Sequence, residues 1–244
     1  MINIVIPMAG HSRFFNQEDT VFPESLIEVA GKIMIARVVE NLQTIHSKLH
    51  FSFIVNQEDC IKFHLDDILR LLTQNDCTLI KVDRPTKGAA CSALLAIDQI
   101  DSELPLIISN SNQIFSTDLN SILQTFKTHH YDSAVISFET LHPRWSYVRL
   151  DEEGHIVETA EKRPISKHAI AGFYYFKEGR EFTKAAMQSI EKKASVNGLY
   201  YIAPTLNEMV IQNKKLGVAH IQVSDYHTFY SPQKIKEYEQ GYAL

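Results

Sequence analysis

The sequence predicts an α/β fold of three layers, in which helices cover both faces of a mixed, mostly parallel sheet. Two observations predict this fold. Short apolar segments rich in β-forming residues, such as residues 2–8 and 104–109, alternate with segments whose apolar residues recur at helical spacing. The 244 residues, in which glycine and proline are sparse and spread out, can bury one sizeable core without a long linker. We therefore expect a single domain spanning residues 1–244.

Alternating strands and helices are expected along residues 1–115. Residues 2–8 form an apolar strand, and a helical pattern follows over residues 34–45. Such alternation predicts parallel strands that are joined by crossover helices and covered on both faces. The other elements expected in this half are strands at 51–55, 78–82 and 104–109 and helices at 59–75 and 87–97.

A small β-hairpin insertion is expected in the second half, residues 116–244. Two strand-like segments, 142–150 and 156–159, flank the turn signal Asp151-Glu-Glu-Gly154. The other elements expected in this half are strands at 133–138 and 169–176 and helices at 181–193 and 204–213. These two helices could cover the sheet or form a dimer contact, and both interpretations stay open.

Ligands of such folds bind beyond the carboxyl ends of the strands, so the loops after Ile6, Val55, Val82 and Ser109 should converge on one crevice. The first of these loops contains Ala9-Gly-His-Ser12, a small-residue turn whose backbone N–H groups could face an anion, with Arg13 as the cation in reach. An ordinary strand-to-loop turn with a solvated arginine stays open as the alternative.

Two further loops carry unusual residues for simple connections. Thr86-Lys-Gly-Ala-Ala-Cys-Ser92 opens a helix with small residues, which permits close approach of a base or ribose to backbone N–H groups at a positive helix end. A helix start chosen for tight packing would look the same. Ser109-Asn-Ser-Asn-Gln113 places several amide side chains after a buried strand, although Asn is also a common turn former.

Composition narrows the classes of partner. A formal net charge of −5 and 22% charged residues give no electrostatic reason to expect nucleic acid or an anionic membrane as partner. No apolar run is long enough for a spanning helix, which needs about 18 residues, and Met1 leads directly into a strand, so we expect a cytoplasmic protein. The three cysteines lack paired spacing and are expected to be small buried or partly buried apolar residues, and the eleven histidines lack metal-ligand spacing.

The segments Ala9–Phe14 and Phe22–Lys32 together resemble the opening of the sugar nucleotidyltransferases, which join a sugar phosphate to a nucleoside triphosphate and release pyrophosphate. The block from Trp145 to Phe176 resembles the sugar-binding half of such enzymes from capsule and surface-polysaccharide pathways. The resemblance covers nearly the whole chain. It implies the Rossmann-like fold of nucleotide-diphospho-sugar transferases, with a nucleotide-binding half at 1–115 and a sugar-phosphate-binding half at 116–244.

By this resemblance, the substrates are a nucleoside triphosphate and a sugar phosphate, and the cofactor of an active enzyme is Mg²⁺. Glu161 and Lys162 would face the sugar phosphate, although spacing alone favours a solvated charge pair worth under about 1 kcal/mol. The implied site residues are Arg13 and Lys162 for catalysis, Ala9, Gly10, Ser12, Gly88, Ala89 and Asn110 for the nucleotide, Glu161 and Gly172 for the sugar phosphate, and Asn112 for the metal.

The chain departs from the family's pattern where chemistry is expected. Glu24 stands in place of a lysine, and Asn112 stands in place of the aspartate that holds Mg²⁺. The loop is shortened, with His11 in place of two residues, one of them a glycine, while Leu199 and Thr228 replace acidic residues. A misplaced unit charge a few ångströms from the reacting groups costs roughly 3 to 4 kcal/mol at an effective dielectric near 20.

Two hypotheses therefore stay open. The first is a working nucleotidyltransferase that uses Arg13 and Lys162, with Lys87 or Lys32 in place of the missing lysine. The second is a catalytically degenerate relative, a pseudoenzyme, that binds nucleotide, sugar phosphate or a protein partner without turnover; it explains the clustered substitutions better. A glycosyltransferase is a weaker third hypothesis, because Asn110-Ser-Asn112 lacks the carboxylate pair that commonly surrounds the metal in such enzymes. An oligomer remains open in every case.

Overall fold

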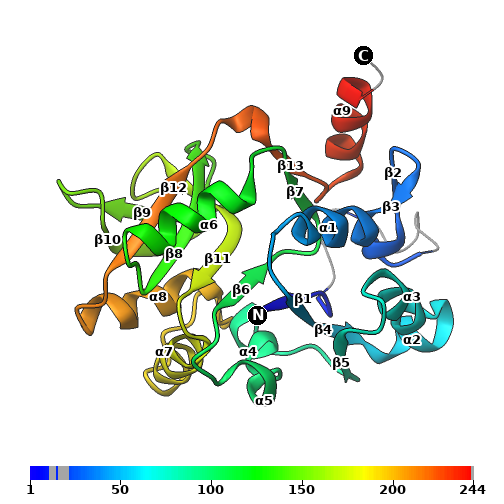
Figure 1. Ribbon diagram of the computed structural model, residues 1–244, viewed down its shortest axis with the longest axis horizontal. Coiled ribbons are helices and arrows are strands. Elements are labelled where there is room, and N and C mark those ends of the chain that lie inside the picture. Colours follow the sequence, from blue (N-terminus) through cyan, green and yellow to red (C-terminus); the bar gives the residue numbers. More distant parts are fainter. Residues whose placement is uncertain (11–14, 16–21, 243–244) are drawn as a thin grey trace.

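A computed structural model describes residues 1–10, 15 and 22–242. In this part of the chain, a central sheet of nine strands runs through the molecule (Figure 1). Its first part is parallel, because β1 pairs in parallel with β4 on one side and β6 on the other, and β4 pairs in parallel with β5. The bounds of these strands are Ile2–Pro7 for β1, Leu49–Asn56 for β4, Cys77–Val82 for β5 and Leu106–Ser109 for β6.

The second half of the chain adds strands around β11, which is antiparallel to β6, β8 and β9. The expected hairpin is present as β9 and β10, which pair antiparallel across the turn that contains Gly154. An additional edge strand, β12, pairs in parallel with β8. The bounds are Ser133–Glu139 for β8, Ser146–Leu150 for β9, Ile156–Glu161 for β10, His168–Phe176 for β11 and Leu216–His220 for β12.

Helices cover both faces of this sheet, as Figure 1 shows with α1 and α6 above it and α4, α5 and α7 below it. Two separate hydrophobic clusters lie on the two faces. In β1, Ile4 belongs to the cluster with α1 and α6, and Val5 belongs to the cluster with α4, α7 and α8, because successive side chains of a strand point to opposite sides. The mixed, mostly parallel three-layer α/β fold is thereby confirmed. The bounds are Met34–Gln43 for α1, Ala89–Leu94 for α4, Ile97–Ile100 for α5, Leu119–Thr128 for α6, Gly179–Glu191 for α7 and Ile202–Ile211 for α8.

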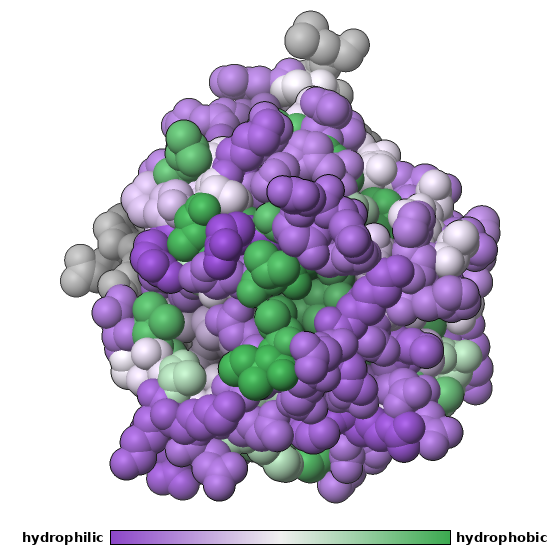
Figure 2. Space-filling view, turned by 90° about the vertical axis from the view of Figure 1, so that its left-hand side faces the viewer, coloured by the Kyte–Doolittle hydropathy of each residue, from purple (hydrophilic) through white to green (hydrophobic). Residues whose placement is uncertain are grey.

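The helices α7 and α8 cover the sheet, which was one of the two interpretations open for them. Phe182 and Ala186 of α7 and Leu206 and Met209 of α8 are buried in the core. The face of the molecule that carries β9, β10 and β12 is largely hydrophilic, with an apolar area near its centre and smaller apolar areas around it (Figure 2).

Two expected helices are interrupted. Residues 59–75 form two helices, α2 (Gln57–Phe63) and α3 (Leu65–Leu72), because His64 between them has the left-handed φ of 53°. Residues 87–97 similarly give the two short helices α4 and α5. The elements for which the sequence pattern gave no bounds are α6, the 3₁₀ helix η1 (Glu24–Leu26), a second one (Val223–Asp225), and the short strands β2 (Glu28–Val29), β3 (Lys32–Ile33), β7 (Gln113–Phe115) and β13 (Tyr226–Thr228), together with β12 and helix α9 (Pro232–Tyr242).

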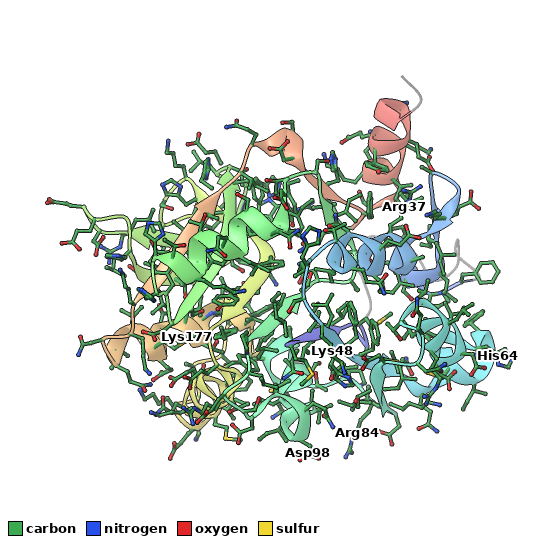
Figure 3. The ribbon with its side chains drawn as sticks, viewed as in Figure 1. Arg37, Lys48, His64, Arg84, Asp98 and Lys177 are labelled. Atoms are coloured by element: carbon green, nitrogen blue, oxygen red, sulfur yellow. The ribbon has the colours of Figure 1, made fainter. Side chains whose placement is uncertain are left out.

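The end of the described chain returns to its beginning. Helix α9 lies beside the β2–β3 hairpin, and Glu239 accepts a hydrogen bond of 3.0 Å from the backbone N–H of Ala30. Arg37, which extends from α1 toward the same hairpin (Figure 3), donates to the carbonyl oxygens of Val29 and Ala30. These contacts hold the hairpin, α1 and α9 together.

Cys60, Cys77 and Cys91 are free thiols, of which Cys60 is buried and the other two are half-buried, as expected. Among the described residues, no helix is both long and apolar enough to cross a membrane.

Strand β11 contains a glycine that no other residue can replace without strain. Gly172 lies at a register shift of the strand and has a φ of +60°. A Cβ atom there would come within 2.2 Å of the Asn110 side-chain nitrogen and 2.4 Å of the Gln113 side-chain oxygen. The substitution therefore combines backbone strain with a steric clash in a packed region.

We predict that Gly172→Ala lowers the free energy of unfolding by more than about 3 kcal/mol, measured by urea denaturation. Gly154→Ala is the matched control, since Gly154 also has a positive φ, +83°, but nothing lies within 4 Å of its would-be Cβ. That variant should lose only about 1 to 2 kcal/mol, the cost of the left-handed conformation itself. Equal losses in the two variants would show that crowding at Gly172 contributes nothing.

Candidate functional site

A pocket of about 290 Å³ lies at the carboxyl end of β1, between the loop that follows this strand and the loop that precedes α4. It brings together four of the six residues expected to bind a nucleotide, namely Ala9, Gly10, Gly88 and Ala89. The loops after β1 and β5 therefore converge as the topology of a parallel sheet requires. Of the other expected residues, Ser12 and the catalytic candidate Arg13 lie outside the described residues.

The wall of this pocket depends on a close approach between two distant segments. Gly88 has a φ of +110°, and a Cβ there would come within 2.3 Å of the carbonyl oxygen of Tyr200. The Tyr200 N–H donates to the carbonyl of Lys87 at 2.7 Å, and its carbonyl accepts from the N–H of Ala90 at 3.0 Å. Leu199 consequently lines the pocket.

The expectation of free N–H groups at the start of a helix over 87–97 needs correction. Helix α4 has only six residues, and the N–H of Ala90 in its first turn is already bonded to Tyr200. Gly88 accordingly serves the close packing of two backbones, which was the alternative interpretation for this segment, and at the same time lines the pocket.

A second pocket of about 430 Å³ continues the first along the carboxyl ends of β4 and β5, since the two share Ala9 and Pro85. Six of its ten lining residues carry polar or charged side chains. The residues are Asn56, Gln57, Glu58, Ile61, Lys62, Val82, Asp83 and Arg84, besides the two shared ones.

Asn110 and Gly172, expected to contact the nucleotide and the sugar respectively, lie next to each other rather than in the pocket of Gly88. The backbone N–H of Asn110 donates to the carbonyl of Gly172 at 3.1 Å. The buried Gln113 side chain donates to the same carbonyl at 2.9 Å and accepts from Tyr226 at 2.9 Å and from the Asn110 amide at 3.3 Å. Gly172 thus allows the amides of Asn110 and Gln113 to pack against β11.

Glu24 and Asn112, which stand where the family's pattern has a lysine and an aspartate, are in direct contact. The Asn112 side-chain nitrogen donates to a Glu24 carboxylate oxygen at 2.8 Å, across 88 positions of sequence. The backbone of Asn112 accepts from the N–H of Phe229 at 2.8 Å, and Thr228 pairs with Gln113 between β13 and β7. Burial raises the pKa of Glu24, and the hydrogen bond from Asn112 opposes that shift in part.

Candidate metal ligands are few. The described residues contain no group of three or more His, Cys, Asp and Glu side chains that could hold a metal ion. Asp225, three positions before Thr228, is half-buried, and its backbone carbonyl accepts from the N–H of Ser116, at the opposite end of β13 from Asn112. Oxygen donors for a hard cation at the Asn112 position are the amide of Asn112 itself and the carboxylate of Glu24.

Glu161 and Lys162 are not the solvated charge pair that spacing alone favours. Glu161 accepts a hydrogen bond from the hydroxyl of Ser146, and burial raises the pKa of Glu161 although Ser146 and Lys162 both lower it. The Lys162 ammonium donates to the Tyr201 hydroxyl at 2.7 Å and lies 4.7 Å from the centre of that ring. Lys162 has a left-handed φ of 55°, as expected of a residue whose direction is imposed by its surroundings.

Three side chains near Glu161 and Lys162 had no assigned role in the sequence. These are Ser146, Tyr201 and the buried Tyr174, whose pKa is raised by burial and by the charge of Glu161. Tyr201 lies two positions after Leu199, which the sequence did single out, but its partner Lys162 is 39 positions away.

Lys32 and Lys87, the two candidates to replace the missing lysine, differ in how available their ammonium groups are to a ligand in the pocket. The Lys32 ammonium bonds to both carboxylate oxygens of Glu40 at 2.8 Å on the surface. Lys87 is exposed beside Gly88, and its charge reaches Cys91. Of these two, Lys87 is the one next to the pocket.

Comparisons with known proteins find similarity to one family and to several solved structures of the same fold. A model of the family described as "Nucleotidyl transferase" matches residues 20–217. The chain is similar in structure to a nucleoside-diphosphate-sugar pyrophosphorylase from Vibrio cholerae RC9, with a TM-score of 0.84 and 20% sequence identity over 97% of this chain and 99% of that one. It is also similar to a UDP-glucose pyrophosphorylase complexed with UDP-glucose, with a TM-score of 0.77 and 18% identity over 100% of this chain and 99% of that one. Among curated proteins, no sequence matches significantly.

The half-buried carboxyl of Glu161 generates a prediction about pH. Because its pKa in the folded state is raised above its usual value of 4.5, its contribution to stability is present below pH 4.5 and is lost as pH rises through the folded-state pKa. Glu161→Gln removes the charge. We therefore predict that this variant melts at a higher temperature than the wild type at pH 7.5, by about 2 to 4 °C for each kcal/mol, and that the gain shrinks toward pH 4.

Thermal denaturation followed by circular dichroism at both pH values checks this expectation. Glu152→Gln, in the exposed turn of the β9–β10 hairpin, is the control and should leave the melting temperature unchanged at either pH. A Glu161→Gln protein that is less stable than the wild type at pH 7.5 contradicts the account of a charge destabilised by burial.

Proposed function

The chain belongs to the nucleotidyl transferase family, and we propose that it transfers a nucleotidyl group from a nucleoside triphosphate to a sugar phosphate with release of pyrophosphate. One observation carries this proposal: three consecutive residues join the two parts of the site. Leu199 lines the pocket of Gly88, Tyr200 is bonded to the backbone around Gly88, and Tyr201 is bonded to Lys162. A nucleotide beside Gly88 and a phosphate beside Lys162 would therefore both adjoin one short segment.

The nucleotide would occupy the crevice formed by the two adjoining pockets. Small residues at Ala9, Gly10, Gly88 and Ala89 line this crevice and leave room in it for a ribose or base. The volume of about 290 Å³ for the first pocket is near the lower end of small-molecule sites, and the second adds about 430 Å³. We assign residues 1–115 to nucleotide binding and residues 116–244 to the sugar phosphate.

In the reaction, a phosphate oxygen of the sugar phosphate attacks the α-phosphorus of the nucleoside triphosphate. A bond forms between that oxygen and the α-phosphorus, and the bond from the α-phosphorus to the bridging oxygen breaks, so that pyrophosphate leaves. Catalysis of such a transfer consists mainly of positioning and of neutralising charge. Lys162 is the described cation that we assign to the sugar phosphate, and Arg13 is assigned to the triphosphate.

Tyr201 and Glu161 would position these groups. Tyr201 holds the Lys162 ammonium by its hydroxyl and its ring, which fixes the direction of a long, otherwise mobile side chain. Glu161, held by Ser146, is a hydrogen-bond acceptor for sugar hydroxyls. Mg²⁺, when bound, would neutralise charge on the triphosphate, and the oxygen of Asn112 has the donor chemistry for it.

The resemblance of residues 145–176 to enzymes of capsule and surface-polysaccharide pathways supports a sugar phosphate destined for such a polymer. Nucleoside triphosphates are made and kept in the cytoplasm, so we place the reaction there. Nucleic acid and membrane are not among the partners that we propose.

A protein that binds the same ligands without turnover is the second candidate. Two observations favour it: Leu199 places an apolar side chain in the pocket, and Glu24 places a carboxylate where a cation is expected. Such a protein would bind the nucleotide, the sugar phosphate or both, but release no pyrophosphate. A coupled assay for pyrophosphate with the common nucleoside triphosphates and a panel of sugar 1-phosphates separates the two candidates.

If pyrophosphate is released, we predict that Lys162→Met lowers kcat/KM by about 100-fold or more, because one charge-stabilising donor is lost. Tyr201→Phe, which keeps the ring but loses the hydroxyl that holds Lys162, should lower it less and raise the KM for the sugar phosphate.

Lys167→Met is the control for the loss of a lysine close in sequence, since the Lys167 ammonium pairs with Glu139 on the surface. It should behave as the wild type does. A Lys162→Met enzyme with wild-type kcat/KM contradicts the role assigned to Lys162.

A further inference from the structure

The contact between Glu24 and Asn112 shows that two departures from the family's pattern are one coupled feature. The position expected to be cationic carries a carboxylate, and the position expected to be a carboxylate carries an amide, and the two side chains touch at 2.8 Å. The pair therefore still contains one carboxylate, which Glu24 supplies in place of the residue at position 112. A carboxylate oxygen at Glu24 lies within hydrogen-bond distance of the residue where the expected one would be.

Among the described residues, no cationic side chain pairs with the Glu24 carboxylate. Glu24 is half-buried at the start of η1, and among the described residues its hydrogen bond comes from the Asn112 amide. A carboxylate that is partly removed from water is stabilised by a paired cation or by neutralisation, and a single amide donor offsets only part of the desolvation. This site therefore favours the arrival of a positive charge from outside the described residues.

The hydrogen bond also fixes which atoms remain for a ligand. The Asn112 amide uses its nitrogen toward Glu24, so its oxygen is turned away from that contact, and Glu24 uses one of its two oxygens. The atoms left are a carboxylate oxygen and an amide oxygen, on side chains in contact. Hard oxygen donors, including one carboxylate and substrate phosphates, are the usual surroundings of protein-bound Mg²⁺.

We propose that Glu24 is a carboxylate ligand of the divalent cation in this protein, with the Asn112 side-chain oxygen as its neighbour. The proposal rests on the function proposed above for the identity of the cation's second partner, the triphosphate. Glu24 would then bind the cation, whereas a comparison of charges alone predicts that Glu24 impairs catalysis. The proposal also explains why both positions differ together, since an Asp at 112 beside Glu24 would place two carboxylates in contact.

A purely structural hydrogen bond is the competing explanation, and the neutral amide of Gln distinguishes it. Gln at position 24 keeps an oxygen that accepts from Asn112, with nearly the same shape, but loses the charge. A structural role would survive this change, whereas cation binding would not.

Mn²⁺, followed by electron paramagnetic resonance, is the probe for the site because it substitutes for Mg²⁺ at oxygen ligands. The wild type is titrated with Mn²⁺ without nucleotide, next to Glu24→Gln and Asn112→Asp. We expect Glu24→Gln to weaken Mn²⁺ binding at least about tenfold, since even the loss of an outer-shell partner costs that much. Asn112→Asp should strengthen it, because a second carboxylate is added.

Glu28→Gln is the matched control, since Glu28 is an exposed carboxylate four positions along the same segment and should leave Mn²⁺ binding unchanged. Circular dichroism verifies that each variant is folded. Equal Mn²⁺ affinity in the wild type, Glu24→Gln and Asn112→Asp overturns the proposal, and so does an absence of Mn²⁺ binding by the wild type.

The pyrophosphate assay on the wild type separates this result from the fate of the proposed function. Release of pyrophosphate together with Mn²⁺ binding that ignores Glu24 refutes the ligand and leaves the transferase. Mn²⁺ binding that depends on Glu24, without release for any substrate tried, supports the ligand and favours the protein that binds without turnover.

Discussion

The arrangement of the site depends on the hydrogen bonds that the Gln113 side chain makes. It is buried, and its amide bonds to the carbonyl of Gly172 in β11 while its oxygen accepts from Tyr226 in β13 and from Asn110 after β6. Three segments that are far apart in sequence are fixed by one residue. A buried amide with both its ends satisfied specifies a single arrangement, because any slip of a strand would leave polar atoms unpaired. Because Asn112 directly precedes Gln113, its position is fixed as well.

The charged side chains near Gln113 are arranged differently from what the family's pattern implies. The contact of Glu24 with Asn112 keeps one carboxylate at the expected place, and the segment 199–201 links the pocket of Gly88 to Lys162. Comparing the chain with the family's pattern one position at a time therefore overstates how much charged chemistry the site has lost. Leu199 remains a true change of chemistry, because an apolar side chain in the pocket cannot hold a sugar hydroxyl.

Sequence periodicity predicted the layers and most long strands and helices, because burial on two faces leaves a strong pattern in residues such as Ile4 and Val5 of β1. It did not predict the break at His64, since one residue with a left-handed φ does not disturb apolar spacing. The short strands β7 and β13 were missed because each exists only through its pairing with the other, more than a hundred positions away.

The candidate site was predictable to a similar degree. Ala9, Gly10, Gly88 and Ala89 were placed correctly in one crevice by the rule on carboxyl ends of strands. The contacts of Lys162 with Tyr201 and of Glu24 with Asn112 were not predictable, since each joins elements whose distance in space only the folded chain defines.

Calorimetric titration of the purified protein with each common nucleoside triphosphate, with and without Mg²⁺, tests the central claim most directly. The account predicts that one triphosphate binds in preference to the others and that Mg²⁺ strengthens its binding. Failure of all of them to bind, with Mg²⁺ present, would contradict the assignment of the crevice beside Gly88 to a nucleotide.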